Sequence, residues 1–120
     1  MLFTIDGLEM TDIPKRRKAD YQRWLKQLSP SDHDKIVAEL NRLIDERAGQ
    51  KFKPTSLLPG NDWSGSVFEP IFAVCGESVQ AAGWFFGLIV WQTMIKRPEK
   101  WYFTDTDMPG REILGKVYFL

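Results

Sequence analysis

A long apolar segment constrains the fold of this chain more than any other feature. Residues 79–95 read VQAAGWFFGLIVWQTMI, and only Gln80, Gln92 and Thr93 interrupt the apolar run. A helix at the surface of a water-soluble protein keeps its apolar side chains on one stripe, whereas this segment is apolar around nearly its whole circumference. We therefore expect a helix that is surrounded by protein or by lipid.

The length of the run separates these two environments. A helix needs roughly 20 predominantly apolar residues to cross a bilayer. The most apolar part, residues 81–95, is shorter than that. We expect the buried core helix of a soluble protein, with no membrane partner.

The chain is rich in large aromatic side chains, which can form one hydrophobic core. The 120 residues include five Trp and eight Phe, and burial of each such ring stabilises a fold by roughly 1.5–3 kcal/mol. A chain of this length matches one ordinary domain. Because no repeat or linker divides the sequence, we expect residues 1–120 to form a single compact domain.

Charge is balanced along the chain. Lys plus Arg and Asp plus Glu both number 16, whereas nucleic-acid-binding domains concentrate positive charge on one face. The one basic run, Lys15, Arg16, Arg17 and Lys18, spreads around a helix rather than along one side of it. We expect a solvated helix start and no nucleic-acid partner. A net charge near zero also removes a repulsion that opposes self-association.

The chain has one cysteine, Cys75, and one histidine, His33. An intrachain disulfide and a zinc site of several Cys or His ligands are therefore excluded, and we expect no metal and no cofactor. We interpret Cys75 as a buried small apolar residue and His33 as a solvent-facing residue of a helix start. Residues 1–10 lack the pattern of a secretory signal, so we expect a cytoplasmic protein.

Local patterns predict a strand and three helices before the apolar helix. Residues 2–5 predict the strand. A helix follows that is capped by Thr11 or Asp12, has Pro14 in its first turn and ends at residue 28. Ser29 and Pro30 predict the cap and first position of a second helix up to residue 49, antiparallel to the first. Residues 66–76 predict a short third helix, in which Ser66 and Glu69 form either a capping box or a turn.

The C-terminal part predicts a long helix and a hairpin. The apolar helix is expected from residue 77 or 78 to Lys96. Residues 101–104 and 113–120 are rich in aromatic and β-branched residues and flank a predicted turn at residues 105–110. The predicted fold class is α+β: about four helices, one of them long and buried, packed with a small antiparallel sheet. This sheet consists of the hairpin, to which the N-terminal strand adds.

Aromatic side chains on the apolar helix suggest self-association. Trp84, Phe85, Phe86 and Trp91 point in several directions around the helix axis, and a small domain leaves some of them uncovered. A second copy is the commonest way to close such a surface. The first functional hypothesis is a non-enzymatic interaction domain, homo-oligomeric through the central helix or the hairpin, which presents a surface or shallow pocket to a partner.

The loop before the third helix combines polar groups with one aromatic ring. Asn61, Asp62, Trp63, Ser64 and Glu69 are the candidate ligand-binding residues. A small polar ligand would stack on Trp63 and bond to Asp62 and Glu69. In the alternative interpretation the polar residues form turns and Trp63 fills the core. A third hypothesis is a hydrolase or other enzyme that uses carboxylates such as Asp62 and Glu69, with a raised carboxyl pKa in a cleft as its mark.

Overall fold

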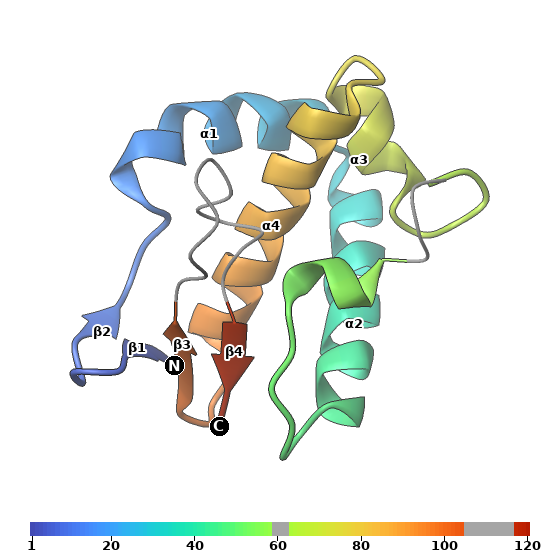
Figure 1. Cartoon of the computed structure of the whole chain (residues 1–120). Helices are drawn as coiled ribbons and strands as arrows, with labels where there is room; N and C mark the ends of the chain where they lie inside the picture. The colour runs from blue at the N-terminus through green and yellow to red at the C-terminus, as the bar shows by residue number, and fades with distance from the viewer. Residues whose placement is uncertain (59–62, 105–116) are drawn as a thin grey trace.

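A long buried helix, α4 (Val79–Lys96), runs through the middle of the molecule (Figure 1). Ser78 caps its start, because the Ser78 side chain accepts a hydrogen bond from the backbone N–H of Ala81 over 3.2 Å. The backbone becomes extended at Arg97, immediately before Pro98, where a proline disfavours helical geometry. Most side chains on all sides of α4 are buried. The predicted core helix is confirmed.

The computed structural model describes residues 1–58, 63–104 and 117–120. The predicted turn at residues 105–110 and the first part of the strand predicted over 113–120 lie outside the described residues. The remaining elements follow in chain order: β1 (Leu2–Thr4), β2 (Glu9–Met10), the 3-10 turn η1 (Lys15–Arg17), α1 (Lys18–Gln27), α2 (Pro30–Glu46), the 3-10 turn η2 (Pro54–Leu57), α3 (Glu69–Val74), then α4, β3 (Trp101–Thr104) and β4 (Val117–Phe119).

Helices α1 and α2 pack against α4 rather than against each other. Tyr21 and Trp24 of α1 lie 6.0 and 5.5 Å from Phe85, measured between ring centroids. Ser29 caps α2 as predicted and accepts a hydrogen bond from the N–H of Asp32 over 3.1 Å. In Figure 1, α1 crosses the top of the molecule and α2 runs downward. The two helices therefore do not form the expected antiparallel hairpin, since α4 offers both of them the larger apolar surface. Three side chains of α2 are fully buried: Ile36, Leu40 and Ile44.

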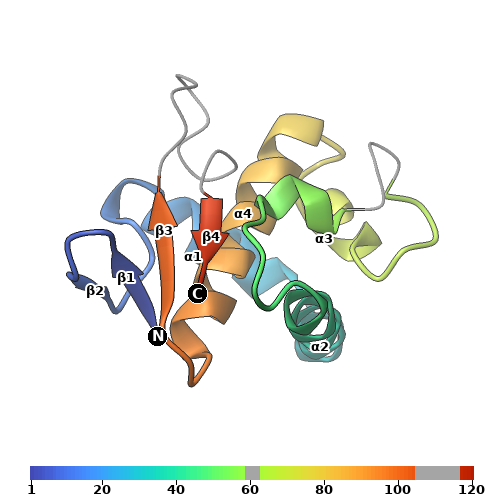
Figure 2. The same cartoon turned by 60° about the horizontal axis from the view of Figure 1, so that its bottom comes forward.

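The strands form one four-stranded sheet in the order β2-β1-β3-β4 (Figure 2). β1 pairs antiparallel with β2, and β3 pairs antiparallel with β4. β1 runs parallel to β3, with Leu2 opposite Trp101. The sheet is thus mixed rather than wholly antiparallel, because the helices between β1 and β3 return the chain to the same end of the sheet, as parallel pairing requires. The predicted α+β class, with N- and C-terminal strands in the sheet, is confirmed.

The rings of α4 find their partners within the same chain. Phe86 packs against Phe68 with ring centroids 5.2 Å apart, and Trp91 packs against Phe103 at 4.8 Å. The indole N–H of Trp91 also donates a hydrogen bond to the backbone carbonyl of Asp12 over 3.0 Å. No helix within residues 1–58, 63–104 and 117–120 combines the length and apolarity needed to cross a membrane.

Candidate functional site

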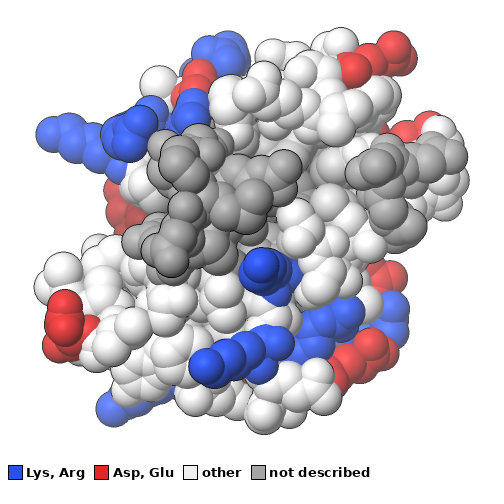
Figure 3. All heavy atoms as spheres, viewed as in Figure 1, with Lys and Arg blue, Asp and Glu red and all other residues white. Residues whose placement is uncertain are grey.

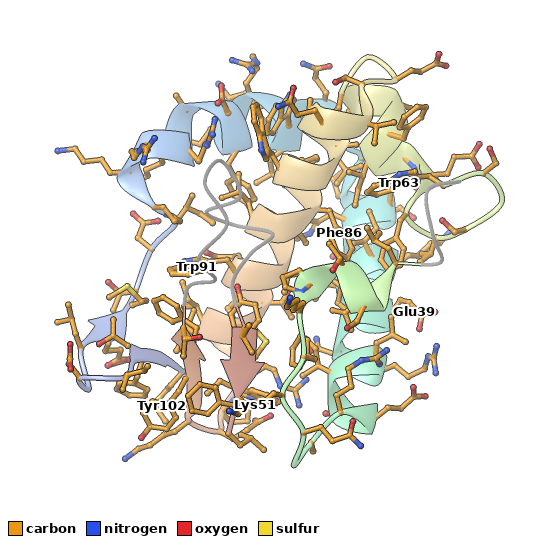
Figure 4. All side chains as sticks on the ribbon, viewed as in Figure 1. Glu39, Lys51, Trp63, Phe86, Trp91 and Tyr102 are labelled. Atoms are coloured by element: carbon orange, nitrogen blue, oxygen red, sulfur yellow. The ribbon has the colours of Figure 1, made fainter. Side chains whose placement is uncertain are left out.

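Trp63, the aromatic residue of the predicted ligand loop, is part of the core. Its side chain is 5% exposed. The ring stacks on Phe72 with centroids 6.5 Å apart and meets Phe86 edge-on at 5.9 Å (Figure 4). This is the packing that the core interpretation of Trp63 requires, and it leaves little indole surface for stacking on a ligand.

Hydrogen bonds within the loop form a turn ahead of α3. The Ser66 hydroxyl donates to the carbonyl of Trp63 over 2.8 Å and accepts from the N–H of Phe68 over 3.2 Å. The Glu69 carboxylate accepts from the N–H of Gly65 over 3.2 Å. Of the two alternatives for the start of α3, the turn is therefore present and the capping box is not, because α3 has no side-chain cap.

The predicted ligand residues do not all share one environment. Ser64 and Glu69 are exposed, whereas Trp63 is buried. Asn61 and Asp62 lie outside the described residues. Their use as a ligand site, or as an acid and base with Glu69, stays a prediction.

Three aromatic side chains form a row across the outer face of the sheet. Phe3, Tyr102 and Phe119 are register partners on the neighbouring strands β1, β3 and β4. Ring centroids are 5.9 Å apart between Phe3 and Tyr102, and 5.9 Å apart between Tyr102 and Phe119. All three side chains are partly exposed. Because successive strand residues point to opposite faces, their neighbours in the strands lie in the core: Leu2, Trp101, Phe103 and Tyr118.

A charged residue lies at each end of this aromatic row, and the two charges are opposite. Glu9 of β2 is exposed and lies opposite Phe3, so both side chains are on the same face of the sheet. Lys51 precedes a β-bridge that extends the sheet beyond β4, and its ammonium nitrogen lies 5.7 Å from the ring centroid of Phe119. Figure 4 labels Tyr102 and Lys51 on this part of the molecule. The order across the face is Glu9, Phe3, Tyr102, Phe119 and Lys51.

Exposed aliphatic side chains lie beyond the ends of the strands that carry the row. Ile5 and Leu8, in the turn between β1 and β2, are 66% and 65% exposed, and Leu120 after β4 is 48% exposed. Charged side chains border an uncharged area on the lower part of the view in Figure 3. Partly exposed aromatic side chains bordered by charged ones are typical of an interaction site.

Sequence reasoning missed this surface for two reasons. Trp101, Tyr102 and Phe103 are all aromatic, so the strand has no alternation of apolar and polar residues to mark its outer side. The position of Phe3 beside Tyr102 depends on pairing between distant segments. The row of partly exposed rings appears only once the strands are aligned.

Arg97 joins the end of α4 to α2. Its guanidinium donates a hydrogen bond to the side-chain oxygen of Asn41 over 2.8 Å and forms ion pairs with Asp45 and Glu99. Burial acts to lower the pKa of Arg97, but the hydrogen bonds to both carboxylates raise it above its ordinary value. Burial acts to raise the pKa of Glu99, and hydrogen bonds from its own backbone, Arg97 and Trp101 hold it below its ordinary value. These contacts of Arg97 link the C-terminal end of α4 to α2.

The remaining candidate groups show no reactive arrangement. Burial raises the pKa of the Cys75 thiol to about 11, so the thiol stays protonated at neutral pH. Among the residues that the structure describes, no three His, Cys, Asp or Glu side chains gather closely enough to hold a metal ion. Comparison of the chain with protein-family models, curated proteins and solved structures finds no match. We therefore infer the function from the geometry of this chain, and above all from the aromatic row.

Proposed function

We propose that this chain is a homo-oligomeric interaction domain that associates through the outer face of its sheet. The observation that supports this proposal is the aromatic row of Phe3, Tyr102 and Phe119, in register across three strands and partly exposed. Removal of aromatic surface from water is the main driving force of protein association. The occupant of the face is a second copy of the chain.

The charges at the ends of the row support a second copy as the occupant. A two-fold axis parallel to the strands reverses the order of the row in the facing copy. Tyr102 then opposes Tyr102, and Glu9 opposes Lys51 of the second copy on both sides of the axis. The face is thus complementary to itself, as a two-fold interface requires. Packed sheets keep their strands within about 30° of each other, which suits this arrangement.

The packing of α4 favours the sheet over the central helix as the surface of self-association. The sequence suggested the central helix or the hairpin. The large rings of α4 lie against side chains of their own chain, so the sheet formed by β1, β3 and β4 is the better candidate.

Sedimentation of the Tyr102→Lys variant tests the proposal. We expect the natural chain to sediment as a dimer at micromolar concentration and this variant as a monomer, because a charge is placed in the centre of the face. Val79→Lys is the matched control, since Val79 is also an exposed apolar residue but lies at the start of α4. Circular dichroism reports whether each variant is folded. A natural chain that is monomeric throughout this range, or a dimeric and folded Tyr102→Lys variant, would reject the proposal.

A single-stranded nucleic acid is the competing occupant of the face. Aromatic side chains on a sheet stack on bases, and lysines beside them contact phosphates. The balanced charge of the chain argues against such a ligand. A monomeric natural chain that binds a labelled oligonucleotide, with affinity lost in Tyr102→Lys, would replace self-association with nucleic-acid binding.

The cytoplasm is the proposed location of this domain. Cys75 is a buried free thiol, and free thiols are maintained in reducing compartments. Expression of a tagged chain followed by cell fractionation tests this assignment, and recovery in a secreted fraction would contradict it.

A further inference from the structure

A cavity between α2 and α4 offers a binding site separate from the sheet. Its volume is about 610 Å³, within the roughly 300–1,000 Å³ that is usual for small-molecule sites. Val37 of α2 and Ile89 of α4 form an apolar part of the cavity wall. Arg97, with its partners Asp45 and Glu99, closes one end.

The other end carries hydrogen-bond donors. Four side chains there, Tyr21, His33, Gln92 and Lys96, also line a neighbouring cavity of about 220 Å³, so the two cavities meet at these residues. Lys96 is exposed and forms no ion pair within the described part of the chain. Amide, imidazole, hydroxyl and ammonium groups can all donate to one anionic group.

Tyr21 is the most informative of these residues. Its side chain is 8% exposed and its ring packs against Phe85. Its side chain lines both cavities, and its hydroxyl makes no hydrogen bond with any residue that the structure describes and is not closed off from solvent. A ligand in the cavity would supply a hydrogen-bond partner.

The charges around the cavity restrict the ligand and orient it. Arg97 is shared by two carboxylates, so its end of the cavity has an excess of negative charge. Lys96 supplies positive charge on the cavity wall, and Asp34, 4.0 Å from His33, adds a third carboxylate to the lining. A ligand with one negative charge would therefore turn that charge toward Lys96, and a dianion would meet stronger repulsion from the carboxylates.

We propose that this cavity binds a small organic carboxylate, with its apolar part between Val37 and Ile89 and its carboxylate bonded to Lys96 and Tyr21. The proposal goes beyond self-association and does not depend on it. His33 lines the cavity and is the only histidine of the chain, so its two ring-proton resonances are readily identified and report ligand entry.

Titration of the natural chain with benzoate, followed by the His33 resonances in proton NMR, tests the site. We expect a saturable shift with benzoate and a dissociation constant at least about tenfold weaker for benzyl alcohol, which has a similar body but no charge. Lys96→Gln and Tyr21→Phe should each weaken benzoate binding, by about tenfold for Lys96→Gln. Lys35→Gln, an exposed change on α2 outside the cavity lining, should leave the dissociation constant unchanged.

Two results would overturn the proposal. One is the absence of a saturable His33 shift in the natural chain, and the other is equal benzoate affinity in Lys96→Gln and Lys35→Gln. The Tyr102→Lys variant should bind benzoate as the natural chain does. The outcome for the cavity is therefore distinguishable from the outcome for self-association.

Discussion

The guanidinium carbon of Arg17 lies 4.2 Å from the ring centroid of Trp84. Trp84 is partly exposed, whereas Phe85, Phe86 and Trp91 on the same helix are buried. The Arg17 side chain thus covers a ring that the sequence suggested a second subunit would cover. This contact shields part of the Trp84 ring within one chain.

Replacement of Arg17 by Ala should expose Trp84 and lower the free energy of unfolding by about 0.5–1 kcal/mol, the usual contribution of an exposed cation–π contact. The ion pair of Arg17 with Asp20 at 3.8 Å is partly exposed and adds little. Urea denaturation measures the change. Lys26→Ala, an exposed change in the following helix α1, is the control, and an equal loss in both variants would contradict the role of Arg17.

Truncation of Trp63 to Ala should lower the free energy of unfolding by about 3–5 kcal/mol, because it leaves a cavity beside Phe72 and Phe86. Trp63→Phe keeps part of the ring packing and should cost less. Urea denaturation of both variants gives the two values. Near-normal stability of Trp63→Ala, together with loss of a bound ligand, would instead favour the loop as a binding site.

Glu99 should make the stability of the chain depend on acid pH. Its pKa in the folded state lies below the ordinary value of 4.5, so its stabilising effect is present above that value and is lost as the pH falls through the folded pKa. Melting temperatures of the natural chain should therefore decrease below about pH 4.5. In Glu99→Gln this decrease should be smaller, whereas Asp6→Asn, at an exposed turn residue, should leave it unchanged. An identical pH profile for Glu99→Gln and the natural chain would rule out this linkage.

A charge exchange tests the orientation proposed for the two facing sheets. Glu9→Lys and Lys51→Glu should each raise the dimer dissociation constant about tenfold, because two attractive pairs per dimer become repulsive. The double variant restores opposite charges across the two-fold axis and should regain the natural affinity. Sedimentation equilibrium measures the three constants. A double variant that is weaker than both single variants would mean that the copies face each other in another orientation.

Local sequence patterns predicted the elements whose causes are local. Ser29 and Pro30 marked the start of α2, since a side-chain cap and a fixed proline φ act within a few residues. The apolar character of residues 79–95 predicted burial of α4, because no orientation of that helix exposes a polar face. The start of α1 was predicted too early, since residues Lys15–Arg17 form a 3-10 turn before the helix. The 3-10 geometry depends on contacts that a propensity pattern does not contain.

The candidate sites were predicted less well than the fold. Trp63 was named as a ligand residue or a core residue, and residue type alone could not decide between them. The cavity residues Tyr21 and Lys96 come from different helices, so no spacing in the sequence brings them together. The aromatic row was not predicted either, because its residues come from strands that are distant in the sequence.

One apolar core helix, a capped second helix and aromatic strands near the C-terminal end can be predicted from the amino-acid order alone, because they follow from side-chain chemistry over a few turns. Which of the aromatic side chains face water depends on how the whole chain packs. The parallel pairing of β1 with β3 places Phe3 beside Tyr102, and that pairing depends on how α1 and α2 pack around α4. Strand register is a property of the whole packed chain, since a shift of one residue would turn these rings into the core.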